Sequence, residues 1–347
     1  PEGIKMLPIY FALIEAEIPV VLCSTGQHNT LLQEVFDNCN VMPDYALAIM
    51  KQDQDLSYIT CSVLEKIKKV YEAVNPTCVL VQGDTTTVMA AALAAFYQKI
   101  PIGHVEAGLR TGDLLNPYPE EANRKLVSTL AYFHFTPTDQ ATNNLLQEGY
   151  KKESIFCTGN TVVDALVSIQ NKIKNKTVLI RQKLLDACFQ NNKKLVLLTV
   201  HRRESFPEGI VEILSAVKTY ALEHPDTIFI YPHHPNPTVI QAIKKINLQM
   251  ISNVIIFSPL LYHELVYVMT HVNLVMTDSG GIQEEAVSLG KTVLVLRDKS
   301  ERMEGVWHGL AHLVGTKKSL IMTMLAQHLA VEKTESSKNN SLYGDGH

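Results

Sequence analysis

The sequence predicts an α/β fold of two domains, each built around a parallel β-sheet. Three observations support this prediction: short apolar runs alternate with segments of helical spacing along the whole chain, the apolar runs are continuous, and the two halves carry a similar strand–loop–helix segment. Alternation of strands and helices indicates parallel strands joined by right-handed crossovers. Continuous apolar strands are typical of sheets that are covered on both faces.

The apolar runs locate the expected strands. Residues 88–97 and 124–130 have the apolar spacing of helices and lie between such runs. The expected strands of the first half are residues 20–23, 78–81, 102–105 and 133–135, and those of the second half are residues 195–200, 228–231, 254–257, 274–277 and 292–296.

The two halves of the chain resemble each other in one segment. Residues 79–87 and residues 274–281 both have the pattern of a strand, a loop and the start of a helix. We therefore expect two Rossmann-like domains. Open parallel sheets bind ligands at the carboxyl ends of their strands, so two such domains facing each other would enclose a cleft there. The expected domains are residues 1–165 and 166–347, with a linker within about residues 165–194.

Composition excludes several classes of protein. The 347-residue chain has a net charge of -4, so it offers no overall basic surface to nucleic acid or to an anionic membrane. Its six cysteines form no Cys-x-x-Cys pair, which favours thiols in a reducing compartment. No apolar run approaches the ~18 residues of a membrane span, and no signal peptide opens the chain. These features predict a cytoplasmic protein without a nucleic-acid or membrane partner.

Residues 278–285 follow an expected strand and open an expected helix. Gly280 and Gly281 would let a phosphate approach the backbone, and the helix N-terminus would supply N–H groups and a positive dipole end. Glu285, one turn later, could accept hydrogen bonds from ribose hydroxyls. The alternative interpretation is a tight turn followed by a helix cap.

Three carboxylates are candidates for catalysis. Asp84 could cap a helix, but it precedes three successive threonines, which is more than capping needs. Glu106 follows a buried strand, where a carboxylate is costly unless it is paired or catalytic. Glu120 begins a helix, and matching of the helix dipole is its alternative role. Together, the three carboxylates suit proton abstraction and donation at a sugar carbon.

The first strand of the second half ends at His201, which two arginines follow. Histidine and arginine at the carboxyl end of a strand suit a diphosphate, and the alternative is a surface charge cluster. Residues 231–237 contain two histidines but also prolines, with no cysteine or acidic triad nearby. We therefore expect no metal site there.

Six motifs, in their order along the chain, resemble those of the non-hydrolysing UDP-N-acetylglucosamine 2-epimerases. The resemblance implies the two-domain GT-B arrangement of glycosyltransferases. It also implies a reaction that removes the C2 proton, expels UDP to form 2-acetamidoglucal, and re-adds UDP with C2 inverted. A UDP-sugar substrate, a homodimer, and the absence of metal and redox cofactors are implied as well. The motifs are residues 83–87, 103–112, 119–124, 158–161, 201–204 and 277–285.

The resemblance also implies roles for single residues. Asp84, Glu106 and Glu120 match acidic catalytic positions, and which of them takes the C2 proton is left open. His201 matches a catalytic-site histidine near the diphosphate. Leu265 departs from the family pattern, because many members have at this position an aromatic ring that packs on uracil. The substrate-binding positions implied are Lys5, Leu260, Leu265, Ser279, Gly280, Gly281, Glu285 and Arg302.

Two other functions fit the same residues. One is a hydrolysing relative that releases N-acetylmannosamine and UDP, and the other is a degenerate nucleotide-sugar binder without turnover. Some bacterial members of the family hold a second, regulatory nucleotide sugar at positions that are Asn29, Thr30 and Asp53 here. These residues offer no cation, so we expect weak or absent activation by a second substrate molecule.

The first six residues have the pattern of a helix start, with proline and glutamate in the first turn. In the family, a strand that ends in Gly-Thr-Arg precedes this helix, and its arginine touches the diphosphate. We therefore expect the first strand of the first domain to be missing. We also expect the chain as written to be poorly stable and nearly inactive.

Overall fold

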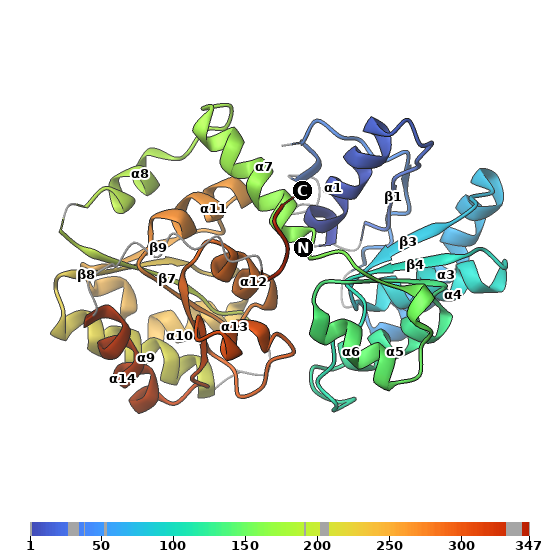
Figure 1. Ribbon diagram of the computed structural model, residues 1–347. Coiled ribbons are helices and arrows are strands. Elements are labelled where there is room, and N and C mark those ends of the chain that lie inside the picture. The colour runs from blue at the N-terminus through green and yellow to red at the C-terminus, as the bar shows by residue number, and fades with distance from the viewer. Residues whose placement is uncertain are drawn as a thin grey trace. The chain divides into compact units, whose positions relative to one another are not determined.

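A computed structural model describes residues 2–26, 35–37, 39–51, 54–190, 192–201, 208–330 and 342–346. The chain divides into two compact units (Figure 1). Unit 1 is Pro1–Ala165 with Gly346–His347, and unit 2 is Leu166–Asp345. The boundary falls inside α7 (Val162–Lys174). The predicted division into a domain of residues 1–165 and a domain of residues 166–347 stays a prediction.

Unit 1 contains two parallel sheets, one of four strands in the order β3-β4-β5-β6 and one of two strands, β1 and β2. In Figure 1, α1 lies above the four-stranded sheet, and α5 and α6 lie below it. The strands are β1 (Cys23–Ser24), β2 (Tyr45–Ala46), β3 (Val79–Gln82), β4 (Ile102–Val105), β5 (Phe133–Thr136) and β6 (Ile155–Cys157). The helices are α1 (Glu2–Glu15), α3 (Leu56–Val74), α4 (Thr86–Tyr97), α5 (Glu120–Leu130) and α6 (Asp139–Gln147), with a 3-10 turn at Lys152–Ser154.

Helix α4 forms the centre of the core of unit 1. It is rich in alanine, the residue with the highest helix propensity, and its small side chains let α3 and α5 pack closely against it. The Thr85 hydroxyl accepts a hydrogen bond from the Val88 N–H and so caps the helix. Asp55 caps α3 in the same way, and Asn75 ends that helix in a left-handed conformation.

Unit 2 contains one parallel six-stranded sheet in the order β12-β11-β10-β7-β8-β9. In Figure 1, α8 and α11 lie above this sheet, and α9, α10 and α14 lie below it. The strands are β7 (Lys194–Thr199), β8 (Thr227–Pro232), β9 (Val254–Phe257), β10 (Leu274–Thr277), β11 (Thr292–Val295) and β12 (Ala311–Leu313). The helices are α8 (Gln182–Cys188), α9 (Glu208–Glu223), α10 (Pro237–Lys245), α11 (Tyr262–His271), α12 (Gly280–Ser288), α13 (Glu304–Trp307) and α14 (Lys318–Ala330), with a 3-10 turn at Leu248–Met250.

The strand order of unit 2 changes direction between β7 and β10. From β7 the chain adds β8 and β9 on one side, and then crosses to add β10, β11 and β12 on the other side. Both central strands are almost wholly buried, as their continuous apolar runs predict. In open α/β sheets the crevice at such a change of direction is where ligands bind. The loops after β7 and β10 are therefore the places to look for a ligand site.

The expected strands at residues 102–105, 254–257 and 274–277 are confirmed with these bounds. Each end of the other expected strands lies within one residue of the observed end, namely for residues 78–81, 133–135, 195–200, 228–231 and 292–296. The expected strand at residues 20–23 is wrong except at Cys23, because Val21 is exposed and Leu22 is only partly buried. Helices α7 and α8 occupy much of the expected linker. Among the described residues, β3 pairs only with β4, and the expectation of a missing first strand stays a prediction.

Candidate functional site

In unit 1, Asp84 and Glu106 follow the ends of two neighbouring strands. β3 and β4 pair in parallel with Gln82 opposite Val105, so the residues that follow them leave the same edge of the sheet. The Gly83 N–H donates to the Val105 carbonyl and extends the pairing by one step, at 3.0 Å. The fold thus brings both predicted carboxylates to one edge, as their positions after apolar runs predict.

Glu106 is buried and has hydrogen bonds from three different parts of unit 1. The Lys5 ammonium of α1 donates to Glu106 Oε1 at 2.6 Å, and Asn160 Nδ2 donates to the same oxygen at 3.5 Å. Gln82 Nε2 donates to Oε2. Glu106 has a φ of 65°, in the left-handed region that non-glycine residues adopt rarely. The Lys5 contact offsets the cost of burying this carboxylate.

Asp84 contacts the fully buried guanidinium of Arg124 on α5. Arg124 Nη2 and Nε donate to Asp84 Oδ2 at 2.7 and 3.0 Å. Arg124 Nη1 donates to Glu121 Oε2 at 2.8 Å, and the other oxygen of Glu121 accepts from the Gly112 N–H. Glu121 is therefore a structural carboxylate. Its neighbour Glu120, the predicted catalytic residue, is the first residue of α5 and only partly buried.

His104 supports the turn that carries Asp84. Its ring is fully buried on β4, and Nε2 lies 2.8 Å from the Gly83 carbonyl oxygen, which can only accept. Burial lowers the pKa of His104 to about 4, and the hydrogen bond to Gly83 opposes this shift. The ring is therefore neutral near pH 7 and carries its proton on Nε2. His134, its partner on β5, is also buried with a pKa lowered to about 4.

In unit 2, His201 and Asp278 lie where the strand order changes direction. His201 comes two residues after β7, and Asp278 follows β10 directly. His201 Nδ1 lies 2.9 Å from Asp278 Oδ1, and the backbone N–H of His201 donates to Asp278 Oδ2 at 2.8 Å. Asp278 is fully buried, whereas the His201 side chain is 40% exposed. The carboxylate therefore orients the ring and directs Nε2 outward as the group that can meet a ligand.

A second histidine stacks on His201. The ring of His234, which follows β8, lies 5.9 Å from the His201 ring with an interplanar angle of 22°. Burial lowers the pKa of His234, and His201 lowers it further. The Thr199 hydroxyl donates to the Thr277 hydroxyl, which also accepts from the Ser279 N–H. Hydroxyl groups thus tie the ends of β7 and β10 together.

The predicted phosphate cradle is the start of α12. Ser279 is the N-cap residue, and Gly280 and Gly281 are the first two helical residues. The first N–H groups of a helix have no partner within the helix, so this turn can bind an anion. The two glycines differ. A Cβ on Gly281 would meet nothing within 4 Å, whereas a Cβ on Gly280 would clash with the guanidinium of Arg302.

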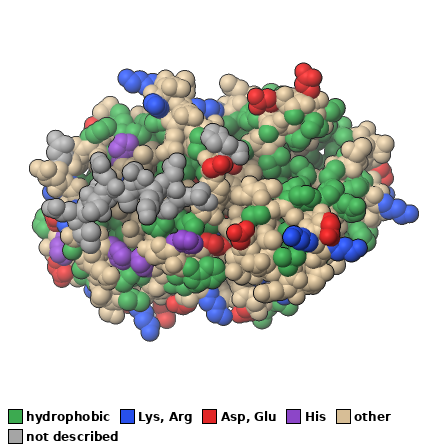
Figure 2. All heavy atoms as spheres, in the orientation of Figure 1, with side chains coloured by type: hydrophobic (Ala, Val, Ile, Leu, Met, Phe, Trp, Pro, Cys, Tyr) green, Lys and Arg blue, Asp and Glu red, His purple; other side chains and the backbone are tan. Residues whose placement is uncertain are grey.

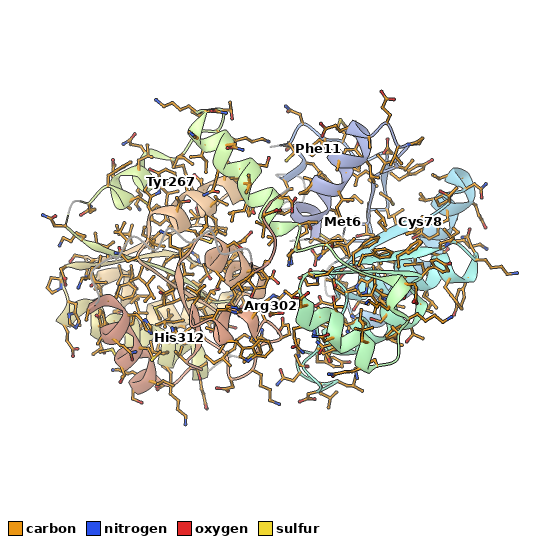
Figure 3. The ribbon with its side chains drawn as sticks, in the orientation of Figure 1. Met6, Phe11, Cys78, Tyr267, Arg302 and His312 are labelled. Atoms are coloured by element: carbon orange, nitrogen blue, oxygen red, sulfur yellow. The ribbon has the colours of Figure 1, made fainter. Side chains whose placement is uncertain are left out.

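Arg302, labelled in Figure 3, is buried among carboxylates. Its Nε lies 3.0 Å from Glu284 Oε1 and its Nη1 contacts Glu301 Oε1. Arg297 reaches the other oxygen of Glu301 at 3.2 Å. Arg302 therefore supports the glycine turn from behind, and the glycine at position 280 makes room for it. The prediction that Arg302 and Gly280 contact substrate stays a prediction.

The remaining predicted binding residues lie around α11 and α12. Glu285 is buried on α12. The pKa of Tyr262 is raised, mainly by the burial of the tyrosine itself and further by the Glu285 carboxylate. Leu260 lies in the loop between β9 and α11, and Leu265 is a partly buried residue of α11. The structure thus places these residues in unit 2 with the glycine turn, while Lys5 lies in unit 1.

Some of the residues that the sequence analysis names cannot be placed. Arg202, Arg203 and the regulatory positions Asn29, Thr30 and Asp53 lie outside the described residues. Within the part of the chain that the structure describes, no group of three or more His, Cys, Asp and Glu side chains could hold a metal ion. No described helix is long and apolar enough to cross a membrane.

The sequence alone assigned no role to the side chains that hold the predicted ones, although three of them lie in its motifs. Gln82 and Asn160 bind Glu106, Arg124 binds Asp84, and Asp278 binds His201. The one local signal was the spacing of Glu121 and Arg124, because residues three apart on a helix contact each other.

Comparison with known proteins identifies the family. The family model described as UDP-N-acetylglucosamine 2-epimerase matches residues 12–347. The chain belongs to this family. A UDP-N-acetylglucosamine 2-epimerase of Yersinia pestis is 46% identical and aligns with 100% of this chain and 93% of its own length. The expected family membership and isomerase class are therefore confirmed.

Solved structures of this epimerase family have the same fold. The Neisseria meningitidis enzyme bound to UDP-GlcNAc matches with a TM-score of 0.93 at 43% identity, covering 100% of this chain and 94% of that one. The S. aureus MnaA–UDP structure matches with a TM-score of 0.88 at 38% identity, covering 100% and 90%. The expected fold class, α/β with Rossmann-like parallel sheets of the GT-B kind, is confirmed.

Proposed function

We propose that this epimerase interconverts UDP-N-acetylglucosamine and UDP-N-acetylmannosamine without hydrolysis. A carboxylate removes the C2 proton while the bond between C1 and the diphosphate oxygen breaks, which gives UDP and 2-acetamidoglucal. The diphosphate oxygen then re-adds at C1 and a proton returns to the opposite face of C2. The observation that carries the proposal is the pair of carboxylates Asp84 and Glu106 at one sheet edge, each bound to a buried cation.

Inversion at C2 requires more than one acid–base group. A single carboxylate that returned the proton to the same face would regenerate the starting sugar, so a second group must act from the other face. Unit 1 supplies Asp84, Glu106 and Glu120 for these roles. Glu106 accepts three hydrogen bonds, one of them from an ammonium, which favours its charged form. It is suited to act as a proton acceptor once Lys5 moves toward the substrate.

We assign nucleotide binding to unit 2. His201, held by Asp278, can donate from Nε2 to the diphosphate and so stabilise the negative charge that develops on the leaving UDP. The Ser279 hydroxyl and the N–H groups of Gly280 and Gly281 can donate to phosphate, and Glu285 can accept from ribose hydroxyls. Leu260 would meet the uracil through its backbone. These assignments rest on the strand-order change of unit 2 and on the solved relatives that are bound to UDP-GlcNAc and UDP.

The reaction is tested by identifying the products. The purified protein is incubated with UDP-N-acetylglucosamine and followed by ¹H and ³¹P NMR. We expect UDP-N-acetylmannosamine to appear with both sugars remaining linked to UDP. Free N-acetylmannosamine with stoichiometric UDP would identify a hydrolysing enzyme instead. Binding without any product would identify a nucleotide-sugar binder.

The homodimer and the cytoplasmic location are part of the same proposal. Unit 1 carries exposed apolar side chains on and after α1, among them Phe11, Ile14, Ile18 and Val21. Figure 2 shows hydrophobic surface over unit 1, and surface of this kind is typical of interfaces. All six cysteines are thiols, which supports a reducing compartment. Light scattering during size-exclusion chromatography measures the mass, and a monomer would contradict the dimer.

A further inference from the structure

Arg124 connects two carboxylates that differ in burial. Its guanidinium is 2% exposed and lies between Glu121, which is fully buried, and Asp84, whose side chain is 23% exposed. One positive charge thus serves two carboxylates.

The geometry at Asp84 distinguishes its two oxygens. Both Arg124 nitrogens donate to Oδ2, at 2.7 and 3.0 Å. Oδ1 accepts no hydrogen bond from the described residues. A bidentate pair would use one oxygen for each nitrogen and would occupy both. Here the fork holds a single oxygen, so Oδ1 remains available to a ligand.

Helix α5 holds Asp84 at two points. Asn123 Nδ2 donates to the Asp84 carbonyl at 2.8 Å, and the adjacent Arg124 holds the carboxylate. The first turn of the same helix carries Glu120. Because backbone and side chain of Asp84 are both tied to α5, the spacing between Asp84 and Glu120 is set by one rigid element.

We infer that Arg124 is a positioning residue that fixes Asp84 Oδ2, so that Asp84 Oδ1 is the oxygen that exchanges a proton with the sugar. Glu121 binds the guanidinium from its other side, and α5 fixes the spacing between Asp84 and Glu120. The inference rests on the proposed role of Asp84 in C2 proton transfer. It adds which atom acts and what holds that atom in place.

The test is a double-mutant cycle between Arg124→Gln and Asp84→Asn. C2 deuterium exchange at saturating UDP-N-acetylglucosamine reports the proton transfer, calorimetry with UDP reports binding, and thermal unfolding reports stability. Misplacing a catalytic group by about 1 Å can cost on the order of 10²-fold. We expect Arg124→Gln to lower exchange by about that factor while the UDP Kd stays within about twofold. In the Asp84→Asn background, Arg124→Gln should lower exchange by only about twofold or less.

A matched control separates positioning from stability. Arg110 is a partly buried arginine of unit 1, and it holds Glu148 through two hydrogen bonds of 2.8 Å. Arg110→Gln should lower the unfolding temperature, but its effect on exchange should add to that of Asp84→Asn. Additive effects of Arg124→Gln would overturn the inference.

The outcomes also separate the inference from the proposed function. If Asp84→Asn keeps near-normal exchange, the role of Asp84 and the inference both fail. If Asp84→Asn loses exchange while Arg124→Gln keeps it, the inference alone fails. Should Arg124→Gln not fold, the cycle is run with Arg124→Lys, which keeps the charge but offers one nitrogen in place of a fork. The same non-additivity is then expected.

Discussion

The two units place their polar groups in different ways. In unit 2 the strand order changes direction between β7 and β10, and His201 and Asp278 follow these two strands. In unit 1 the four strands of the larger sheet lie in the order of the sequence, and the polar residues are held by buried cations from helices, Lys5 from α1 and Arg124 from α5. Topology thus locates the site in unit 2, whereas long-range ion pairs build it in unit 1.

The partners differ in their chemistry as well. Lys5 and Arg124 are buried and form ion pairs with Glu106 and Asp84, so they hold these carboxylates in a fixed geometry. The partner of Asp278 is the partly exposed imidazole of His201, whose Nε2 can donate a hydrogen bond to a ligand. This difference suits proton transfer at carbon in unit 1 and binding of a diphosphate in unit 2.

The largest expected effect comes from the carboxylates of unit 1. Asp84→Asn and Glu106→Gln should each lower kcat by ~10²–10⁴-fold, because a positioned acid or base contributes about that much. Neither should change the Kd of UDP by more than a few-fold, as both lie outside unit 2. Coupled-assay kinetics and calorimetry measure the two quantities. A variant that keeps near-normal kcat would assign its residue to structure alone.

A substitution in unit 2 should instead weaken the binding of UDP. His201→Ala removes a hydrogen bond to a charged group, which contributes about 1.5–3 kcal/mol. The Kd of UDP should therefore rise about 10- to 150-fold. His234→Ala, which removes the stacked neighbour, serves as the comparison and should have a smaller effect. Unchanged UDP affinity in His201→Ala would separate this histidine from the diphosphate.

Low pH should weaken unit 1 through its buried histidines. His104 and His134 have pKa values lowered to about 4 by burial, against about 6.5 in the unfolded chain. The unfolded state therefore takes up protons first, and stability falls as the pH drops from about 6.5 toward 4. Between pH 7 and pH 5 each histidine should cost about 2 kcal/mol. Urea unfolding at both pH values measures this loss, which should be smaller in His134→Gln. Equal losses in the two proteins would refute the assignment.

The smallest effect distinguishes the two glycines of α12. A Cβ on Gly280 would clash with the buried Arg302 guanidinium, so Gly280→Ala should lower stability by about 1–3 kcal/mol. Gly281→Ala meets no neighbour and should leave stability unchanged or slightly higher, while it weakens UDP binding. Thermal unfolding with and without UDP compares them. A stable Gly280→Ala protein would show that Arg302 can move aside.

Local patterns predicted most of the strands. Continuous apolar runs located β4, β9 and β10 with their exact bounds, because a buried parallel strand needs apolar side chains on both faces. The same pattern failed at residues 20–22, where Val21 is exposed and Val20 and Leu22 are only partly buried. Carboxylates after apolar runs pointed correctly to the sheet edge that holds Asp84 and Glu106.

The partners of these residues could not be predicted. Lys5 and Glu106 are 101 residues apart, and Arg124 and Asp84 are 40 residues apart. Such contacts depend on how helices pack on the sheet, which no local period encodes. Gly280 shows the same limit: a glycine pair predicts a phosphate cradle, yet the space at position 280 is taken by Arg302 from another loop.

The most direct test of this division of roles is deuterium uptake at C2. Wild-type protein and Asp84→Asn are incubated with UDP-N-acetylglucosamine in D2O at UDP-sugar concentrations that saturate both. We predict that the wild type places deuterium at C2 of both UDP-sugars, and that Asp84→Asn loses this exchange by at least about 10²-fold while binding UDP normally. Epimerisation without deuterium at C2, or exchange that survives in Asp84→Asn, would contradict the account.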